Sequence, residues 1–228
     1  MQTRILGVVS LLCLTFTVIW LVFLITETAA AGPLETFDQV LAHTARLGTA
    51  FYLTYLNAAL VTVCAITLFA LLYLSYKPAA PGWSAVGAVF IPIYGVMNLA
   101  VYFSQITVVP RLLELHAGPE FQAQSEFLLR QVIQQWPGST IWVVNNLAYA
   151  VLGVPSIIFG ILMLQSSSKL RLAGVLLSLN GAACIAGFAG IIMRSAWLSH
   201  GSLIGGVFFL LALAPMSLVF LQKSSPGS

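Results

Sequence analysis

Charged side chains are scarce in this 228-residue sequence. Only 7% of the residues are Asp, Glu, Lys or Arg, whereas 60% are hydrophobic and the mean hydropathy is +1.00. Soluble domains usually carry about 25% charged residues. A soluble chain of this composition would have too little polar surface to face water, so we expect an integral membrane protein. Its net charge of +3 then reflects membrane orientation and contact with anionic lipid, and we expect no nucleic-acid partner.

The sequence also lacks the residues that common membrane enzymes and carriers use. No Asp, Glu, Lys or Arg falls at the central depth of an apolar run, where proton carriers and intramembrane proteases need charge. There is no HExxH, G-x-S-x-G or P-loop motif. The cysteines, Cys13, Cys64 and Cys184, form no CxxC pair. We therefore lean toward a protein that is not an enzyme, and expect no catalytic residue, metal ligand or cofactor.

Long apolar runs are what the sequence does contain. A spanning helix needs about 20 apolar residues, and six runs qualify, at about 5–26, 50–76, 86–109, 141–165, 172–193 and 203–221. Their Leu, Ile, Val, Phe and Ala do not alternate as barrel strands would. We expect an all-α fold, a polytopic membrane protein with a bundle of six transmembrane helices, in a single integral membrane domain over 1–228. The first run is longer than the ~7–15 residues of a signal peptide, which favours an uncleaved span over cleavage after 29–31.

Charges between the runs differ on the two sides of the expected membrane. One side holds only basic residues, namely Arg4, Lys77, Lys169, Arg171 and Lys223. The other side holds all six acids together with the remaining arginines. Because Lys and Arg favour cytoplasmic segments, we expect both termini in the cytoplasm and a multi-pass location in the cell membrane.

Two longer connections on the outer side are expected to contain short amphipathic helices. The first opens with Gly32-Pro33-Leu34-Glu35 and the second with Gly118-Pro119-Glu120, both typical of helix N-termini. Apolar residues then recur on one face of each segment. We expect both helices at the outer membrane surface, either as a cover for the helix ends or as a gate over a pocket.

Amide and tyrosine side chains gather in the outer half of the second, third and fourth spans. An unpaired amide in hydrocarbon costs several kcal/mol, so these groups must face protein or water. The candidate ligand-binding residues are Tyr52, Tyr55, Asn57, Tyr94, Asn98, Tyr102, Gln105, Asn145 and Asn146. His43, Arg46, Arg111, His116 and Arg194 are candidates for the rim of such a pocket.

Two interpretations of these polar residues remain open. In the first, amides and tyrosines without a buried charge bind a neutral or lipid-like small molecule in an outward-facing pocket, as a carrier or sensor. In the second, the amides only join helices through hydrogen bonds worth about 0.6 kcal/mol each. The protein would then be a structural or accessory subunit whose partner membrane subunit supplies the activity. A cavity joining Asn57, Asn98, Gln105 and Asn145 would favour the first interpretation, and direct pairing would favour the second.

Small residues four positions apart recur in the last two spans. The pairs are Ala183 with Gly187, Ala186 with Gly190, and Gly201 with Gly205. Such pairs let helix backbones approach closely, and we expect them to pack helices within the chain rather than to form a dimer face.

Three short motifs, together with the six-span layout, carry a resemblance. Ala45-Arg46-Leu47-Gly48 leads into the second span, Lys77-Pro78 follows it, and Lys169-Leu-Arg171-Leu-Ala-Gly174 leads into the fifth. In these features the chain resembles families of uncharacterised six-span bacterial membrane proteins, defined by a domain of unknown function. The resemblance implies a bacterial inner membrane, with the lipid bilayer as partner. It implies no activity and no functional residues.

Overall fold

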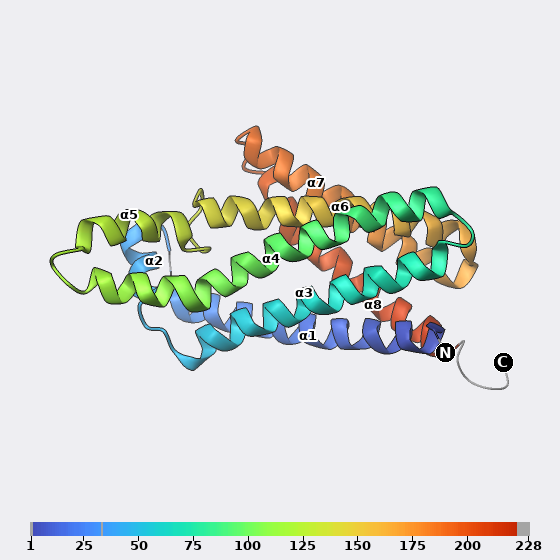
Figure 1. The fold of residues 1–228 in the computed structure, drawn as a ribbon, viewed down its shortest axis with the longest axis horizontal. Coiled ribbons are helices and arrows are strands. Elements are labelled where there is room, and N and C mark those ends of the chain that lie inside the picture. The colour runs from blue at the N-terminus through green and yellow to red at the C-terminus, as the bar shows by residue number, and fades with distance from the viewer. Residues whose placement is uncertain (1, 33, 223–228) are drawn as a thin grey trace.

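The computed structural model describes residues 2–32 and 34–222, and every regular element in these ranges is helical. Six helices are long and apolar enough to cross a membrane, so the all-α six-helix bundle is confirmed (Figure 1). They are α1 (Gln2–Ala31), α3 (Thr49–Tyr76), α4 (Pro81–His116), α6 (Thr140–Ser166), α7 (Arg171–Ile192) and α8 (Gly201–Gln222). Each apolar run expected from the sequence falls within one of these helices, to within one residue.

The six long helices pack side by side in a closed ring. Contacts join α1 to α3, α3 to α4, α4 to α6, α6 to α7, α7 to α8, and α8 back to α1. The start of α1 and the end of α8 lie at the same end of the bundle, which we call the terminal end (Figure 1). The opposite, distal end carries the short helices α2 (Phe37–Thr44) and α5 (Gln122–Val132).

Helix α2 begins where a capping box satisfies its first backbone groups. The Thr36 hydroxyl accepts the Gln39 N–H at 3.3 Å, and the Gln39 side chain accepts the Thr36 N–H at 3.0 Å. The helix therefore starts at Phe37, later than the expected opening at Pro33, which lies outside the described residues. Its buried Phe37 and Val40 pack inward, with the Phe37 ring 5.4 Å from that of Trp136.

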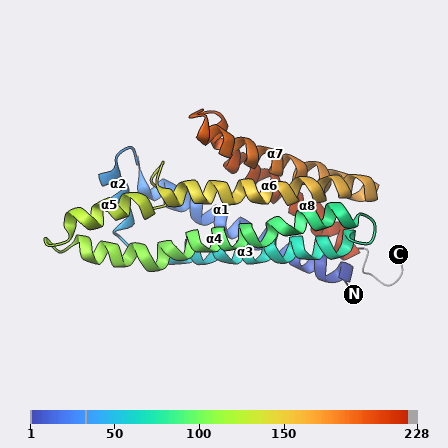
Figure 2. The same ribbon diagram turned by 45° about the horizontal axis from the view of Figure 1, so that its top comes forward.

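Helix α5 runs back along α4 instead of lying across the end of the bundle (Figures 1 and 2). The cause is the length of α4, which continues through Pro110 to His116, beyond the expected end of the third span at Val109. Helix α5 then begins at Gln122 and buries Ser125 and Leu129. Short 3₁₀ turns, η1 (Ser168–Leu170) and η2 (Leu198–His200), join the remaining helices.

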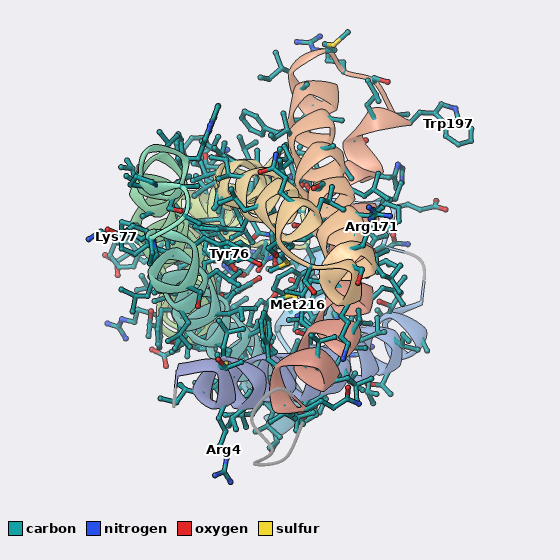
Figure 3. The ribbon with its side chains drawn as sticks, turned by 90° about the vertical axis from the view of Figure 1, so that its right-hand side faces the viewer. Arg4, Tyr76, Lys77, Arg171, Trp197 and Met216 are labelled. Atoms are coloured by element: carbon teal, nitrogen blue, oxygen red, sulfur yellow. The ribbon has the colours of Figure 1, made fainter. Side chains whose placement is uncertain are left out.

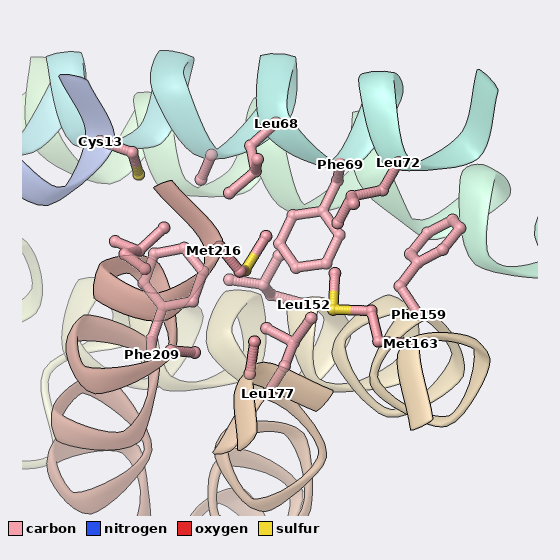
Figure 4. Packing of buried hydrophobic residues seen from close by; sticks show 14 of the residues in the cluster. Cys13, Leu68, Phe69, Leu72, Leu152, Phe159, Met163, Leu177, Phe209 and Met216 are labelled. Carbon is pink, nitrogen blue, oxygen red and sulfur yellow. The ribbon is translucent and has the colours of Figure 1, made fainter. Parts of the chain in front are cut away.

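The terminal half of the bundle has a dense core of aromatic and aliphatic side chains (Figure 4). The Phe69 ring lies 6.0 Å from that of Phe159 and stacks 6.4 Å from that of Phe209. Leu72 and Met163 are fully buried beside them. Lipid tails are as apolar as these side chains, so close van der Waals packing is what favours association here.

Glycines bring α6, α7 and α8 close together. The facing pairs are Gly153 with Gly181, Gly160 with Gly174, and Gly187 with Gly201. A Cβ added to Gly174 would lie 2.7 Å from the Gly160 carbonyl oxygen, so no larger residue fits without moving a helix. The small residues of α7 and α8 thus pack within the chain, and the α6–α7 pairs extend that packing beyond the positions singled out in the sequence.

The two ends of the bundle carry different charges. Arg4, Lys77 and Arg171 surround the terminal end, which faces the viewer in Figure 3. Lys223, assigned to this side from the sequence, lies outside the described residues. All six acids belong to the distal segments, at the end of α1, around α2, at the end of α4 and around α5.

Candidate functional site

A cavity of about 380 Å³ lies inside the helix ring, on the distal side of the aromatic core. We call it the central cavity. All six long helices contribute to its wall, for example through Trp20, Thr62, Asn98, Asn145, Asn180 and Ser202. Its volume lies in the range of about 300–1,000 Å³ that is typical of small-molecule sites. No Asp, Glu, Lys or Arg is among the described residues that line it.

Asn98 lines this cavity and has a side-chain carbonyl oxygen without a hydrogen-bond partner among the described residues. Its Nδ2 donates to the Thr62 hydroxyl at 2.8 Å and to the Tyr94 hydroxyl at 3.2 Å. The Thr62 hydroxyl also donates to the Ala58 carbonyl at 3.0 Å. The Asn98 Oδ1 atom is buried and has no partner in the described chain.

Asn180 on α7 is arranged in the same way. Its Nδ2 donates to the Gly205 carbonyl of α8 at 2.9 Å, and a carbonyl can only accept. Its Oδ1 is therefore the free atom, buried and without a partner among the described residues. Asn180 is not among the candidates predicted from the sequence, because its position in the fifth span predicts a depth closer to the inner side.

Three further polar atoms of the cavity wall lack partners within the described ranges. They are Asn145 Oδ1, Gln134 Oε1 and Ser202 Oγ. An unsatisfied buried polar atom costs about 1–3 kcal/mol, and native structures contain few of them. Together with Asn98 and Asn180, these residues all line the central cavity, which makes it the candidate site.

Tyrosines form one side of the central cavity. The Tyr102 and Tyr149 hydroxyls hydrogen-bond to each other at 2.7 Å and join α4 to α6. The Tyr94 ring lies 6.4 Å from the Tyr149 ring. Asn146 also lines the cavity, but its Nδ2 donates to the Trp142 carbonyl of its own helix at 2.9 Å. This side of the wall is therefore aromatic, and its tyrosine hydroxyls and the Asn146 amide already have hydrogen-bond partners.

Two of the candidate amides are used for packing and do not line the central cavity. Asn57 donates to the Phe16 carbonyl at 2.9 Å and so ties α3 to α1. Gln105 donates to the Val132 carbonyl at 2.9 Å and accepts the Gln134 N–H at 3.0 Å, which holds the connection after α5 against α4. Tyr52 lines neither cavity of this region and packs edge-on against Phe51.

A second cavity of about 400 Å³ adjoins the first at the distal end. Trp20, Leu24, Tyr102 and Gln134 line both cavities. Tyr55 and His43, two of the sequence candidates, line this distal cavity only. The His43 Nε2 atom lies 3.5 Å from the Glu27 carboxylate, which also lines it. A carboxylate and an imidazole therefore line the distal cavity, whereas no described Asp, Glu or His lines the central one.

The other four rim candidates line neither cavity. Arg111 pairs with Glu114 at 2.7 Å on the exposed end of α4. His116 Nδ1 lies 3.2 Å from the Gln122 carbonyl oxygen, at the turn between α4 and α5. Arg46 and Arg194 are exposed. Of the five, only His43 lies at a cavity wall.

Several wall residues were absent from the candidate set. Trp20 had a detectable signal, a tryptophan deep inside an apolar run where interface tryptophans are not expected. Nothing in the sequence indicates that Gln134 and Ser202 line the cavity, because their positions depend on how the connections fold back onto the helices. Comparison with known proteins adds no guide, since no family model, curated protein or solved structure matches the chain.

Proposed function

We propose that this integral membrane protein binds a neutral or lipid-like small molecule in the central cavity, as a carrier or a sensor. The observation that carries the proposal is the set of buried, unpartnered polar atoms from Asn98, Gln134, Asn145, Asn180 and Ser202 around one cavity. A neutral ligand is favoured because a buried charge without a counter-charge is far more costly than a buried hydroxyl or amide.

The alternative, an accessory subunit in which the amides serve only packing, accounts for part of the observations. It fits Asn57 and Gln105, whose hydrogen bonds join helices and connections. It does not account for the free oxygens of Asn98 and Asn180. A subunit that needs a partner helix would also favour a lipid-facing stripe of small residues, whereas the facing glycines of α6, α7 and α8 are used inside the bundle.

Mass spectrometry of molecules that co-purify with the gently solubilised protein tests this function. We expect a small molecule with wild type and with Asn57→Leu, the matched amide replacement outside the cavity, and about fivefold to tenfold less with Asn145→Leu. If no molecule co-purifies with any of them and Asn145→Leu raises the thermal stability, the cavity holds only water and the packing interpretation is favoured.

We place both termini in the cytoplasm of a bacterial inner membrane, so that the central cavity lies in the outer half of the bilayer. The basic residues of the terminal end and the acids of the distal end support this orientation. A membrane-impermeant maleimide tests it with exposed single cysteines at either end. Glu120→Cys should be labelled in intact cells, and Lys77→Cys only after permeabilisation; the reverse pattern would invert the topology.

A further inference from the structure

We infer that the ligand of the central cavity is a bilayer lipid with an uncharged, hydroxyl-bearing head group, which enters sideways between α1 and α8. This inference rests on the proposed function, because it names the chemical class and the route of the same ligand. Two independent features support it: an apolar opening in the helix ring, and the kind of hydrogen-bonding groups left free inside.

The ring is closed at the terminal end and looser at the distal end. Near the terminal end α1 and α8 touch, since a Cβ added to Gly7 would lie 2.9 Å from the Leu221 backbone. Toward the distal end α7 and α8 lean away from the other helices (Figures 1 and 2). Residues from the distal parts of both α1 and α8 line the central cavity, and this is where we infer the opening.

Both edges of this opening are apolar stripes with helical spacing. On α1 the stripe is Trp20, Leu21 and Leu24, and on α8 it is Leu203, Gly206, Val207 and Leu210. All seven line the central cavity, yet Leu203 is 56% and Val207 50% exposed. Residues that line a cavity and also face outward mark a passage between the two. In a membrane the surface they face is lipid.

Gly206, which lines the central cavity and is exposed, has open space beside it. A Cβ added at this position would meet no heavy atom within 4 Å. The preceding residue is the opposite case, because a Cβ on Gly205 would collide with the Cys184 sulfur on the facing helix. A larger side chain at 206 would therefore extend into the opening without disturbing the packing of α7 on α8.

The two unpartnered amide oxygens of the wall, from Asn98 and Asn180, can only accept a hydrogen bond, so they favour a ligand that donates one. Asn98 and Asn180 have committed their N–H groups to protein acceptors and offer only oxygen. A hydroxyl can donate to such an oxygen, whereas a phosphate only accepts and a quaternary ammonium has no N–H or O–H. A phosphate would also bring a negative charge to a wall whose described residues include no Lys or Arg.

The cavity is thus polar deep inside and apolar at its opening, which matches an amphiphile with a hydroxyl head and an acyl tail. The head would lie against the amide oxygens, and the tail would extend between α1 and α8 into the bilayer. A soluble polyol offers the same hydroxyl chemistry without the tail, so the test must separate the two sources.

Native mass spectrometry of the detergent-solubilised full chain makes this distinction with three probes: dioleoylglycerol, dioleoylphosphatidylcholine and free glycerol. We expect wild type to retain dioleoylglycerol about tenfold more than the other two. Gly206→Leu should retain about tenfold less dioleoylglycerol than wild type. Ala182→Leu, which enlarges an exposed residue of α7 that lines neither cavity, is the matched control and should behave as wild type.

Each of the other possible outcomes would overturn a specific part of the inferred ligand, route or function. If Gly206→Leu binds dioleoylglycerol like wild type while Asn145→Leu does not, the lateral route is wrong. Preferential retention of glycerol, or of phosphatidylcholine, would exclude the hydroxyl-bearing lipid but leave small-molecule binding in the cavity intact. If no probe is retained and nothing co-purifies with wild type, the proposed function itself fails.

Discussion

The terminal and distal halves of this bundle are built from the same six helices but packed differently. In the terminal half, Phe69, Phe159 and their neighbours fill the interior, and these side chains are fully buried. In the distal half the same helices surround two cavities. Residues with unpartnered buried polar atoms line these cavities, although Ser84, Ser156 and Ser178 outside them have such atoms too. Since burial from lipid gives little driving force, we expect the well-packed half to contribute most to holding the helices together. The proposed binding belongs to the other half.

The largest expected effect is in the glycine contacts of α6 and α7. A side chain at Gly181 would collide with the Gly153 carbonyl oxygen and lie 2.7 Å from Ile157 Cγ1. Gly181→Leu should cost more than about 3 kcal/mol, because backbone cannot move aside as a flexible side chain can. The midpoint of thermal unfolding in detergent measures this. Gly206→Leu is the control and should leave the midpoint unchanged; equal losses would mean that the distal opening is not open.

The next largest difference between the two halves is expected in the stability lost when a large side chain is replaced by a small one. Phe159 is fully buried in the terminal core, so Phe159→Ala should lower the stability by about 3–5 kcal/mol through lost contacts and a new cavity. Leu210→Ala, at the half-buried wall of the central cavity, should cost less than about 1 kcal/mol. The same thermal measurement compares them. If both variants lost similar stability, the distal half would be packed as tightly as the terminal half.

The apolar composition of the helices was sufficient to predict the six-helix bundle. It was not sufficient to predict which side chains meet inside it. Each span is specified by its apolar length alone, so the six runs matched the six long helices. The continuation of α4 through Pro110 was not expected, because a proline after a complete span usually marks an end. Helix α5 packs alongside this part of α4 and stabilises it. Such a tertiary contact cannot be recognised from the local sequence of α4.

The same reasoning explains the mixed outcome for the candidate site. Asn57 and Asn98 both occupy mid-helix positions in apolar runs, yet one faces a neighbouring backbone and the other a cavity. Rotation about the helix axis decides between these outcomes. In a membrane helix that is apolar all round, no polar face reveals that rotation. Depth was therefore predictable from sequence, whereas the direction of each side chain was not.

Replacing Gln105, which holds the connection after α5 against α4, is expected to have a moderate effect on stability. Gln105→Leu removes the hydrogen bonds to Val132 and Gln134 and leaves a backbone N–H without its acceptor. We expect a loss of about 1–3 kcal/mol and faster hydrogen exchange at the Gln134 amide. Asn57→Leu is the comparison, with a loss of about 0.6 kcal/mol for one interhelical hydrogen bond. Unchanged exchange at Gln134 would show that Gln105 does not hold this connection.

The smallest expected effect is at the tyrosine pair that lies where the two cavities meet. Tyr102→Phe removes the 2.7 Å hydrogen bond to Tyr149 while keeping the ring. Tyr149 lines the central cavity, so we expect water or a ligand to replace the partner that its hydroxyl loses. The unfolding free energy should therefore fall by less than about 1 kcal/mol. A loss as large as that of Gln105→Leu would mean that this hydroxyl pair holds α4 against α6. The distal half would then depend on polar contacts for its stability, as the terminal half depends on packing.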